Sequence, residues 1–199
     1  LWQAGINTRW DMLDGRMTHF FKASRVTNTL IDDDVTSAFR SENRAEAEKL
    51  SYVLAYRFVT GPVRHTVSGL IESDSQTFLP FGVEKSRKQI ATAAEYQADI
   101  AERVLVTGNV RRDDNDSFVD FTTWRATAAL RLPELGMRPH ASIGTGVRLP
   151  TMFEQFGFFG TFVPNPNAQP EESLGWDAGV EFTVLAGRAV VDVTYFEAE

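Results

Sequence analysis

The chain of 199 residues has no cysteine and only three histidines, and these shortages exclude several kinds of site. Without cysteine there is no disulfide framework, no thiolate nucleophile and no thiolate zinc site. His19, His65 and His140 are too scattered to form a histidine-rich metal motif. Most metalloenzyme classes are therefore excluded, and we expect no resident metal or cofactor.

Positive charge and long apolar runs are also scarce. The chain has 20 Lys and Arg against 27 Asp and Glu, which gives a formal net charge of −7. Such a chain repels phosphate backbones, so we exclude nucleic acid as a partner. No run approaches the roughly 18 consecutive apolar residues of a membrane-spanning helix.

Alternation of apolar and polar residues with a period of two is the main pattern in the sequence. In the clearest segment, Val104, Val106 and Val110 share one face, and Asn109 and Arg111 share the other. Val, Thr, Phe and Tyr supply most of the apolar positions, which favours strands over helices. Ten such segments can be traced along the chain, and they predict an all-β, antiparallel up-and-down meander.

The connections between these segments differ in length. The short ones carry hairpin-type residues, and the long ones are polar. The short connections are 11–15, 60–63, 101–103, 133–136 and 185–188, and the long ones are 32–47, 80–88 and 149–173. Strands of about ten residues with tight turns at one end and long loops at the other are typical of a transmembrane β-barrel.

Small apolar residues and one-sided charge favour such a barrel over a soluble carbohydrate-binding β-sandwich, which also alternates. Lipid chains tolerate small side chains that would leave voids in a packed core. The small residues are Ala126, Ala128, Ala141 and Ala178. Charge on the opposite faces suits a water-filled lumen. The lumen-facing residues include Arg125, Arg131, Asp177 and Glu181. Aromatic residues near the strand ends fit interfacial girdles, namely Trp10, Phe58, Trp124, Trp176 and Tyr195.

Ten strands in hydrocarbon must either close on themselves or be joined by others, because every backbone group must be paired. The alternation of short and long connections places both ends of the chain on the long-loop side, whereas intact barrels of this kind begin and end on the short-turn side. We therefore expect residues 1–199 to be an incomplete part of a larger barrel.

Three stretches between 117 and 199 resemble, in order, the TonB-dependent outer-membrane receptors. They are DFTTWR at 120–125, ASIGTGVRLPT at 141–151 followed by FEQFG at 153–157, and NPNAQPEES at 165–173 followed by WDAGVE at 176–181. The motif positions expected to shape the strands and the long loop are Gly144, Gly146, Arg148, Pro150, Glu154, Asn165, Pro166, Asn167, Pro170 and Glu171. The stretch 157–181 is most similar to receptors of the vitamin B12 and siderophore type.

This resemblance implies active uptake of a scarce nutrient chelate, such as a ferric siderophore, haem or vitamin B12, across the outer membrane of a Gram-negative bacterium. It implies three partners besides the chelate: a plug domain of the same chain inside the lumen, the TonB–ExbB–ExbD complex acting through that plug, and outer-membrane lipid. Arg125, Arg131, Asp177 and Glu181 would then hold the plug. A passive porin or adhesin barrel remains the alternative.

Phenylalanines crowd the longest loop. Phe153, Phe156, Phe158, Phe159 and Phe162 fall within ten positions, and exposed aromatic residues at such density mark interaction surfaces. Our hypothesis is that Phe156, Phe158, Phe159 and Phe162 contact the ligand at the extracellular mouth. The alternative is that they pack against neighbouring loops or the rim.

Other motifs in the sequence do not support an enzyme. Gly144-Thr145-Gly146 begins like a dinucleotide fingerprint, but proline follows where a helix should open. The acidic runs 32–34 and 113–116 lack the glycine and distal glutamate of a calcium-binding hand, so we interpret them as solvated loop charge.

Overall fold

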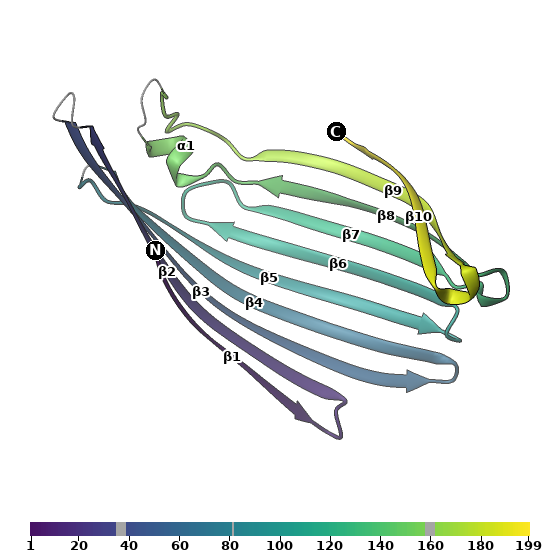
Figure 1. Ribbon diagram of the computed structural model, residues 1–199. Helices are drawn as coiled ribbons and strands as arrows, with labels where there is room; N and C mark the ends of the chain where they lie inside the picture. Colours follow the sequence, from purple (N-terminus) through teal and green to yellow (C-terminus); the bar gives the residue numbers. More distant parts are fainter. Residues whose placement is uncertain (35–38, 81, 158–161) are drawn as a thin grey trace.

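The structure is a computed structural model that describes residues 1–34, 39–80, 82–157 and 162–199. These residues form ten antiparallel strands in one sheet, in chain order (Figure 1), which confirms the predicted meander. The strands are β1 (Trp2–Met12), β2 (Met17–Asp34), β3 (Phe39–Thr60), β4 (Val63–Pro80), β5 (Lys85–Ile100), β6 (Val104–Asn115), β7 (Phe121–Leu130), β8 (Met137–Arg148), β9 (Glu171–Val184) and β10 (Ala189–Ala198). One α-helix, α1 (Met152–Phe156), and two 3₁₀ turns, η1 (Pro133–Leu135) and η2 (Leu185–Gly187), complete the described elements.

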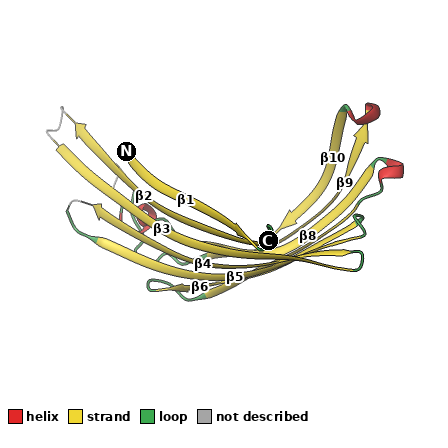
Figure 2. Cartoon of the chain, turned by 90° about the horizontal axis from the view of Figure 1, so that it is seen from below, coloured by secondary structure: helices red, strands yellow, loops and turns green. Residues whose placement is uncertain are grey.

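The sheet is a single curved layer that does not close. Figure 2 shows it as a trough, with β1 and β10 rising on opposite sides. Among the described residues, β1 pairs with β2 alone and β10 pairs with β9 alone. All ten strands lie in this one sheet, so the two stacked sheets of a sandwich are ruled out for this part of the chain. No helix in the described part of the chain is long and apolar enough to cross a membrane.

The short connections lie where the sequence predicts them, but two of the long ones are shorter than predicted. Tight turns at 13–16, 61–62 and 101–103, and the two 3₁₀ turns, join the strands at one end of the trough. The expected loop at 32–47 is wrong, because β2 continues to Asp34 and β3 begins at Phe39. The expected loop at 80–88 is also too long, because β5 begins at Lys85. The connection after β8 remains long, since β9 begins at Glu171.

Register assigns each strand residue to one of two faces. Directly paired residues share a face, so Asn109, Arg125 and Gly144 lie together and continue to Gly175 on β9. We call this polar face the inner face, and the opposite apolar face, with Val106 on it, the outer face. The inner face is the concave one. Its side chains bridge strands that are not neighbours, which the diverging side chains of a convex surface cannot do.

Aromatic residues line both ends of the outer face. Near the short turns, the ring of His65 stacks on Phe58 with 4.6 Å between centroids and shares a 2.7 Å hydrogen bond with the hydroxyl of Tyr96. Toward the other end, the ring centroids of Trp176 and Tyr195 lie 5.5 Å apart. This distribution matches the two aromatic girdles of membrane barrels.

Candidate functional site

A glycine-floored cleft of about 290 Å³ lies on the inner face of β7 to β10. Its floor contains Gly144, Gly146 and Gly175, of which Gly144 and Gly175 are directly paired across β8 and β9. Side chains are missing there, so a partner can approach the backbone of the sheet closely. The cleft therefore offers an inner surface on which another segment could pack.

Gly144 is required by the strands themselves. A Cβ atom at this position would lie 2.7 Å from the carbonyl oxygen of Trp124 and 3.0 Å from the Cβ of Arg125. The β7–β8 ladder ends at Gly144, and the backbone N–H of Trp124 instead donates to the hydroxyl of Thr145 at 3.1 Å. Glycine lets β8 pass close to β7 at the point where the two strands stop pairing.

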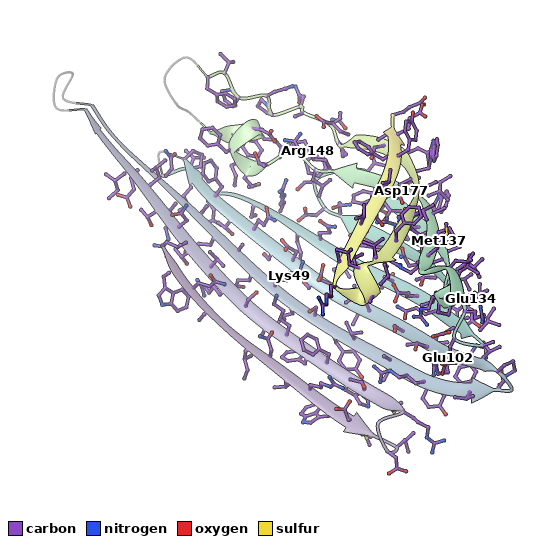
Figure 3. The ribbon with its side chains drawn as sticks, turned by 45° about the vertical axis from the view of Figure 1, so that its right-hand side comes forward. Lys49, Glu102, Glu134, Met137, Arg148 and Asp177 are labelled. Carbon is purple, nitrogen blue, oxygen red and sulfur yellow. The ribbon has the colours of Figure 1, made fainter. Side chains whose placement is uncertain are left out.

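Charged groups flank this cleft. Arg125 donates to the hydroxyl of Ser142 at 2.8 Å, Ser142 donates to the carboxylate of Asp177, and the Arg125 guanidinium lies 3.7 Å from the same carboxylate. Below them, Arg138 pairs with Glu181 at 2.7 Å. Figure 3 labels Asp177 on β9 and Arg148 at the end of β8. The structure thus brings Arg125 and Asp177 together and pairs Glu181 with a different arginine.

Arg131 lies at the short-turn end of the inner face. It donates to the carboxylate of Asp99 at 3.3 Å and to the backbone carbonyl of Glu102 at 3.1 Å. Asp99 also accepts from Arg64 of β4 at 3.1 Å. The Asp99 carboxylate of β5 therefore binds two guanidinium groups, that of Arg64 on β4 and that of Arg131, which follows β7.

Among the described residues the most buried charged side chain is that of Asp113, so the interpretation of the run 113–116 as solvated loop charge is wrong for this residue. Asp113 belongs to β6, is 1% exposed, and accepts from Arg111 at 2.8 to 3.0 Å and from the amide of Gln89. The Nη2 of Arg111, which donates to Asp113, also donates to Glu72 of β4 at 3.1 Å, and Glu72 pairs with Lys49 at 2.9 Å.

Arg111 crosses β5 to reach β4 because the residue between them is small. Ala91 is directly paired with both Glu72 and Asp113 and is 1% exposed. A longer side chain at that position would occupy the space of the guanidinium. No local pattern in the sequence marks this network, because it depends on the register of β4, β5 and β6.

The connection after β8 is organised by the motif residues. Arg148 pairs with Glu154 at 2.6 Å and with Glu171 at 3.2 Å, so it joins the two ends of the loop. Glu154 and Thr151 form a capping box that starts α1. The backbone N–H of Asn165 donates to the carbonyl of Glu154 at 2.9 Å, which returns the chain toward β9.

These contacts also determine the charge of Glu154. The backbone N–H of Thr151 and the Arg148 guanidinium hold the pKa of this carboxyl below its ordinary value. Its carboxylate is therefore favoured in the folded loop.

The loop docks across the inner face instead of extending freely. Helix α1 packs against β4, and its residues Met152 and Gln155 are buried. Arg87 of β5 donates to the carbonyl of Pro150 at 2.5 Å, and the Lys85 ammonium lies 5.4 Å from the ring centroid of Phe156. A loop that leaves β8 is thus fastened to β4 and β5.

The remaining motif residues shape the return of the loop. Asn165 accepts at its side-chain oxygen from the backbone N–H of Asn167 at 3.0 Å, with Pro166 between them. Pro170 directly precedes β9. These are contacts within the loop and leave its exposed surface available.

Of the four phenylalanines in the ligand hypothesis, two can be placed. Phe156 is half-buried beneath Lys85, and Phe162 stacks on Phe153 with 5.2 Å between centroids. Phe162 is 36% exposed and Phe153 is 38% exposed. Phe158 and Phe159 lie outside the described residues.

The described residues show no group of three or more His, Asp or Glu side chains placed to hold a metal ion. The inner face is instead a set of ion pairs and hydrogen bonds around a small-residue cleft. Its chemistry is that of a polar, hydrogen-bonding surface.

Comparison with known proteins identifies the same architecture. The family TonB dependent receptor-like, beta-barrel, matches residues 1–199. Among solved structures, a variant of the ferric enterobactin receptor PfeA from Pseudomonas aeruginosa, in complex with enterobactin, superposes with a TM-score of 0.80 at 14% identity over 98% of this chain and 34% of that one. The siderophore receptor PirA from Pseudomonas aeruginosa gives 0.68 at 15% identity, over 98% and 45%.

A third similar structure is a variant of the hemophore receptor HasR from Serratia marcescens with its hemophore HasA and heme, with a TM-score of 0.75 at 12% identity over 98% of this chain and 39% of that one. The chain thus spans between about a third and a half of the length of these structures. At these identities the likeness shows the fold, and the family match covers the whole sequence. The chain belongs to the TonB-dependent receptor β-barrel family, whose members lie in the Gram-negative outer membrane.

Proposed function

We propose that this chain forms part of the barrel wall of a receptor that takes up a nutrient chelate across the outer membrane. The family match over residues 1–199 carries the proposal. Similar structures include receptors for siderophores and for a haem-carrying hemophore, so a metal chelate is the substrate class we favour. Vitamin B12 stays a candidate from the sequence resemblance alone.

The inner face supports the idea that a plug domain of the same protein fills the lumen. A cleft floored by glycine accepts a close-packed segment, and its rim carries hydrogen-bonding groups of both charges, from Arg125 and Asp177. Arg131 and Glu181 extend this polar surface toward the short turns. A plug held by such contacts can be released without breaking a hydrophobic core, which suits a transporter that must open.

The docked loop after β8 supports ligand capture at the opposite end. The Phe153–Phe162 stack presents two partly exposed rings. The loop that carries them is held in place by its contacts with β4 and β5. Aromatic faces on a positioned loop bind flat or apolar ligands through area and quadrupole contacts.

Growth tests identify the chelate. Deletion of the gene for the full-length receptor should abolish growth on one low-concentration source among ferric siderophores, haem and vitamin B12, and expression of the intact receptor should restore it. Normal growth of the deletion strain on every source would refute the proposal.

Dissipating the inner-membrane proton gradient separates active uptake from a passive porin or adhesin barrel. Uptake through this receptor should stop, since the TonB–ExbB–ExbD complex draws on that gradient. Continued uptake at the same initial rate would favour the passive alternative.

A further inference from the structure

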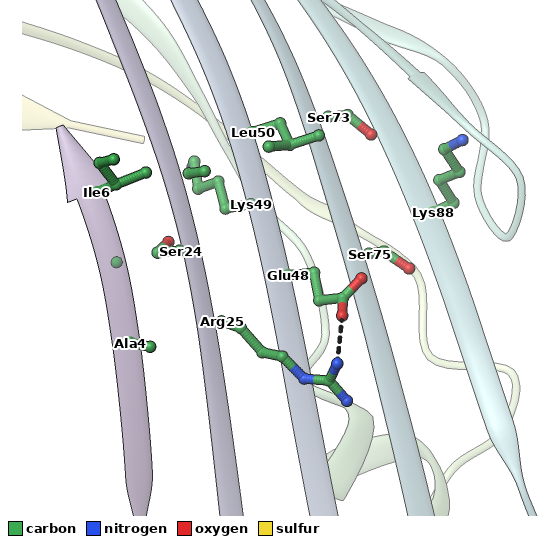
Figure 4. Close-up of a pocket in the computed structure, with 12 residues that line it drawn as sticks. Ala4, Ile6, Ser24, Arg25, Glu48, Lys49, Leu50, Ser73, Ser75 and Lys88 are labelled. Atoms are coloured by element: carbon green, nitrogen blue, oxygen red, sulfur yellow. Dashed lines mark ion pairs between the residues drawn. The ribbon is translucent and has the colours of Figure 1, made fainter. Parts of the chain in front are cut away.

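The outer face carries a groove that the transport function does not explain. It has a volume of about 620 Å³ and runs across β1 to β5 (Figure 4). Most of its lining residues occupy outer-face positions, and several are too small to fill the surface. The small ones at outer-face positions are Ala4, Ala23, Ser73 and Ser75.

Two adjacent rows of paired residues form the groove. One row is polar and consists of Arg25, Glu48, Ser75 and Lys88, each directly paired with the next across β2 to β5. The neighbouring row, one outer-face position closer to the short turns, consists of Ile6, Ala23, Leu50 and Ser73. Figure 4 shows Arg25 and Glu48 on one side of the groove and Ile6 and Leu50 on the other.

This change from apolar to charged coincides with the end of the apolar band. Along β3, the outer-face residues from the short turn are Phe58, Tyr56, Leu54, Tyr52 and Leu50, and the next is Glu48. These apolar positions cover about the nine to eleven residues that a strand needs to cross hydrocarbon. The groove therefore lies where acyl chains meet headgroups at the long-loop end.

The charge of the groove is suited to an anion. Arg25 pairs with Glu48 at 3.1 Å and with Glu46 at 3.0 Å, whereas the Lys88 ammonium has no ion-pair partner among the described residues. Lys49, the other lining cation, pairs with Glu72 on the inner face. On the outer face, Glu46 and Glu48 thus share Arg25, and Lys88 is the lining cation that is left to an anion.

We propose that this groove binds a membrane lipid with a phosphate headgroup. Its acyl chain lies along Ile6, Ala23 and Leu50, where small neighbours leave room. Its phosphate accepts hydrogen bonds from Lys88 and from the hydroxyls of Ser73 and Ser75, with Arg25 at the edge. The inference requires the outer face to meet lipid, and it is independent of which chelate the receptor carries.

Lipid binding to the purified full-length receptor tests the proposal. The probes are dihexanoyl phosphatidic acid below its micelle concentration, the diacylglycerol with the same chains, and inorganic phosphate, each titrated by native mass spectrometry in a non-ionic detergent. Phosphatidic acid should bind at least tenfold more tightly than either of the other two. Equal binding of diacylglycerol would overturn the phosphate assignment, and equal binding of inorganic phosphate would overturn the lipid assignment.

Variants locate the site. The double variant Arg25→Gln/Lys88→Gln should bind phosphatidic acid at least tenfold more weakly, whereas Arg25→Lys/Lys88→Arg should bind like the unmodified receptor. Arg112→Gln is the matched control, because Arg112 is an outer-face cation of β6 that pairs with Asp114 and Asp120 outside the groove. Unchanged binding by the double glutamine variant would refute the assignment.

A second change tests the apolar half without altering charge. Ala23→Phe fills the groove beside Leu50 and should weaken phosphatidic acid binding at least tenfold, while the circular dichroism spectrum stays that of the folded barrel. Full binding by this folded variant would exclude the groove as the position of the acyl chain.

Discussion

Removing Arg111 should destabilise the barrel far more than removing its neighbour Arg112. The Arg111→Ala change takes away the guanidinium that donates to Asp113 at 2.8 to 3.0 Å and to Glu72 at 3.1 Å. Asp113 is 1% exposed and would keep only the amide of Gln89 as a side-chain partner. A buried carboxylate that loses its cation destabilises a protein by about 3 kcal/mol.

The adjacent residue supplies the control. Arg112 has the same side chain on the same strand, but it lies on the outer face and is about half exposed, as is its partner Asp114. Exposed ion pairs contribute about 0 to 1 kcal/mol, so Arg112→Ala should change the free energy of unfolding by no more than that. The two changes thus compare the loss of an arginine that pairs with a buried carboxylate with the loss of one that pairs with an exposed carboxylate.

Urea unfolding of the full-length receptor in lipid vesicles, followed by tryptophan fluorescence, measures both free energies. The double variant Arg111→Ala/Asp113→Ala should regain part of the stability lost in Arg111→Ala, because it removes the stranded charge. A loss for Arg111→Ala no larger than that for Arg112→Ala would refute the reasoning, as would a double variant whose losses simply add.

Three further predictions follow from the site. Gly144→Val should destabilise the barrel by about 1–3 kcal/mol in the same urea assay, because a Cβ there meets a carbonyl oxygen at 2.7 Å; Gly175→Ala, where the nearest atom is at 3.5 Å, is the control and should unfold like the unmodified receptor. The lowered pKa of Glu154 means that its carboxylate stabilises the loop fully above its ordinary value of 4.5, and that this contribution disappears as pH falls through the lowered value. Proteolysis of the loop should therefore increase in that acidic range, and Glu154→Gln should remove this step; a step that persists in the variant contradicts the assignment. Replacing Phe153 and Phe162 by Ser should weaken chelate binding at least tenfold without changing the unfolding curve, and unchanged affinity in isothermal titration would make their stack structural.

The strands and their faces could be predicted because a period of two is a local property. Once Arg125 and Asp177 were assigned to strands, their alternation with apolar neighbours determined which face each occupied, and the register of the structure places them on the same face. The family motif added the long loop and its boundaries at Pro150 and Glu171.

The length of the upper strands could not be predicted by the same rule. Residues 32–47 looked like a loop because their outer-face positions are polar. The backbone ladder of β2 and β3 nevertheless continues past the charged outer-face residues Arg44 and Glu46, as far as the pair Asp34 and Phe39. Polarity therefore marked the end of the membrane and not the end of the strand.

Contacts between segments that lie far apart in the sequence could not be predicted either. Arg87 and Pro150 meet through backbone and side-chain geometry, and no local pattern relates them. Asp113 sits in an acidic run that resembles surface charge, and only the register of β5 against β6 reveals that it is enclosed. Such information resides in the pairing of strands, which a single sequence leaves open.

The uneven strand lengths give the trough one high wall and one low wall. β3 has 22 residues, or about 70 Å of extended chain, whereas an apolar band of about 25 Å crossed at a tilt near 40° takes only about ten residues. β7 has 10 residues and little more than spans that band. The loop after β8 rises from the low side and docks through α1 on β4, which belongs to the high side. Its contacts therefore tie the high wall of the trough to the low wall.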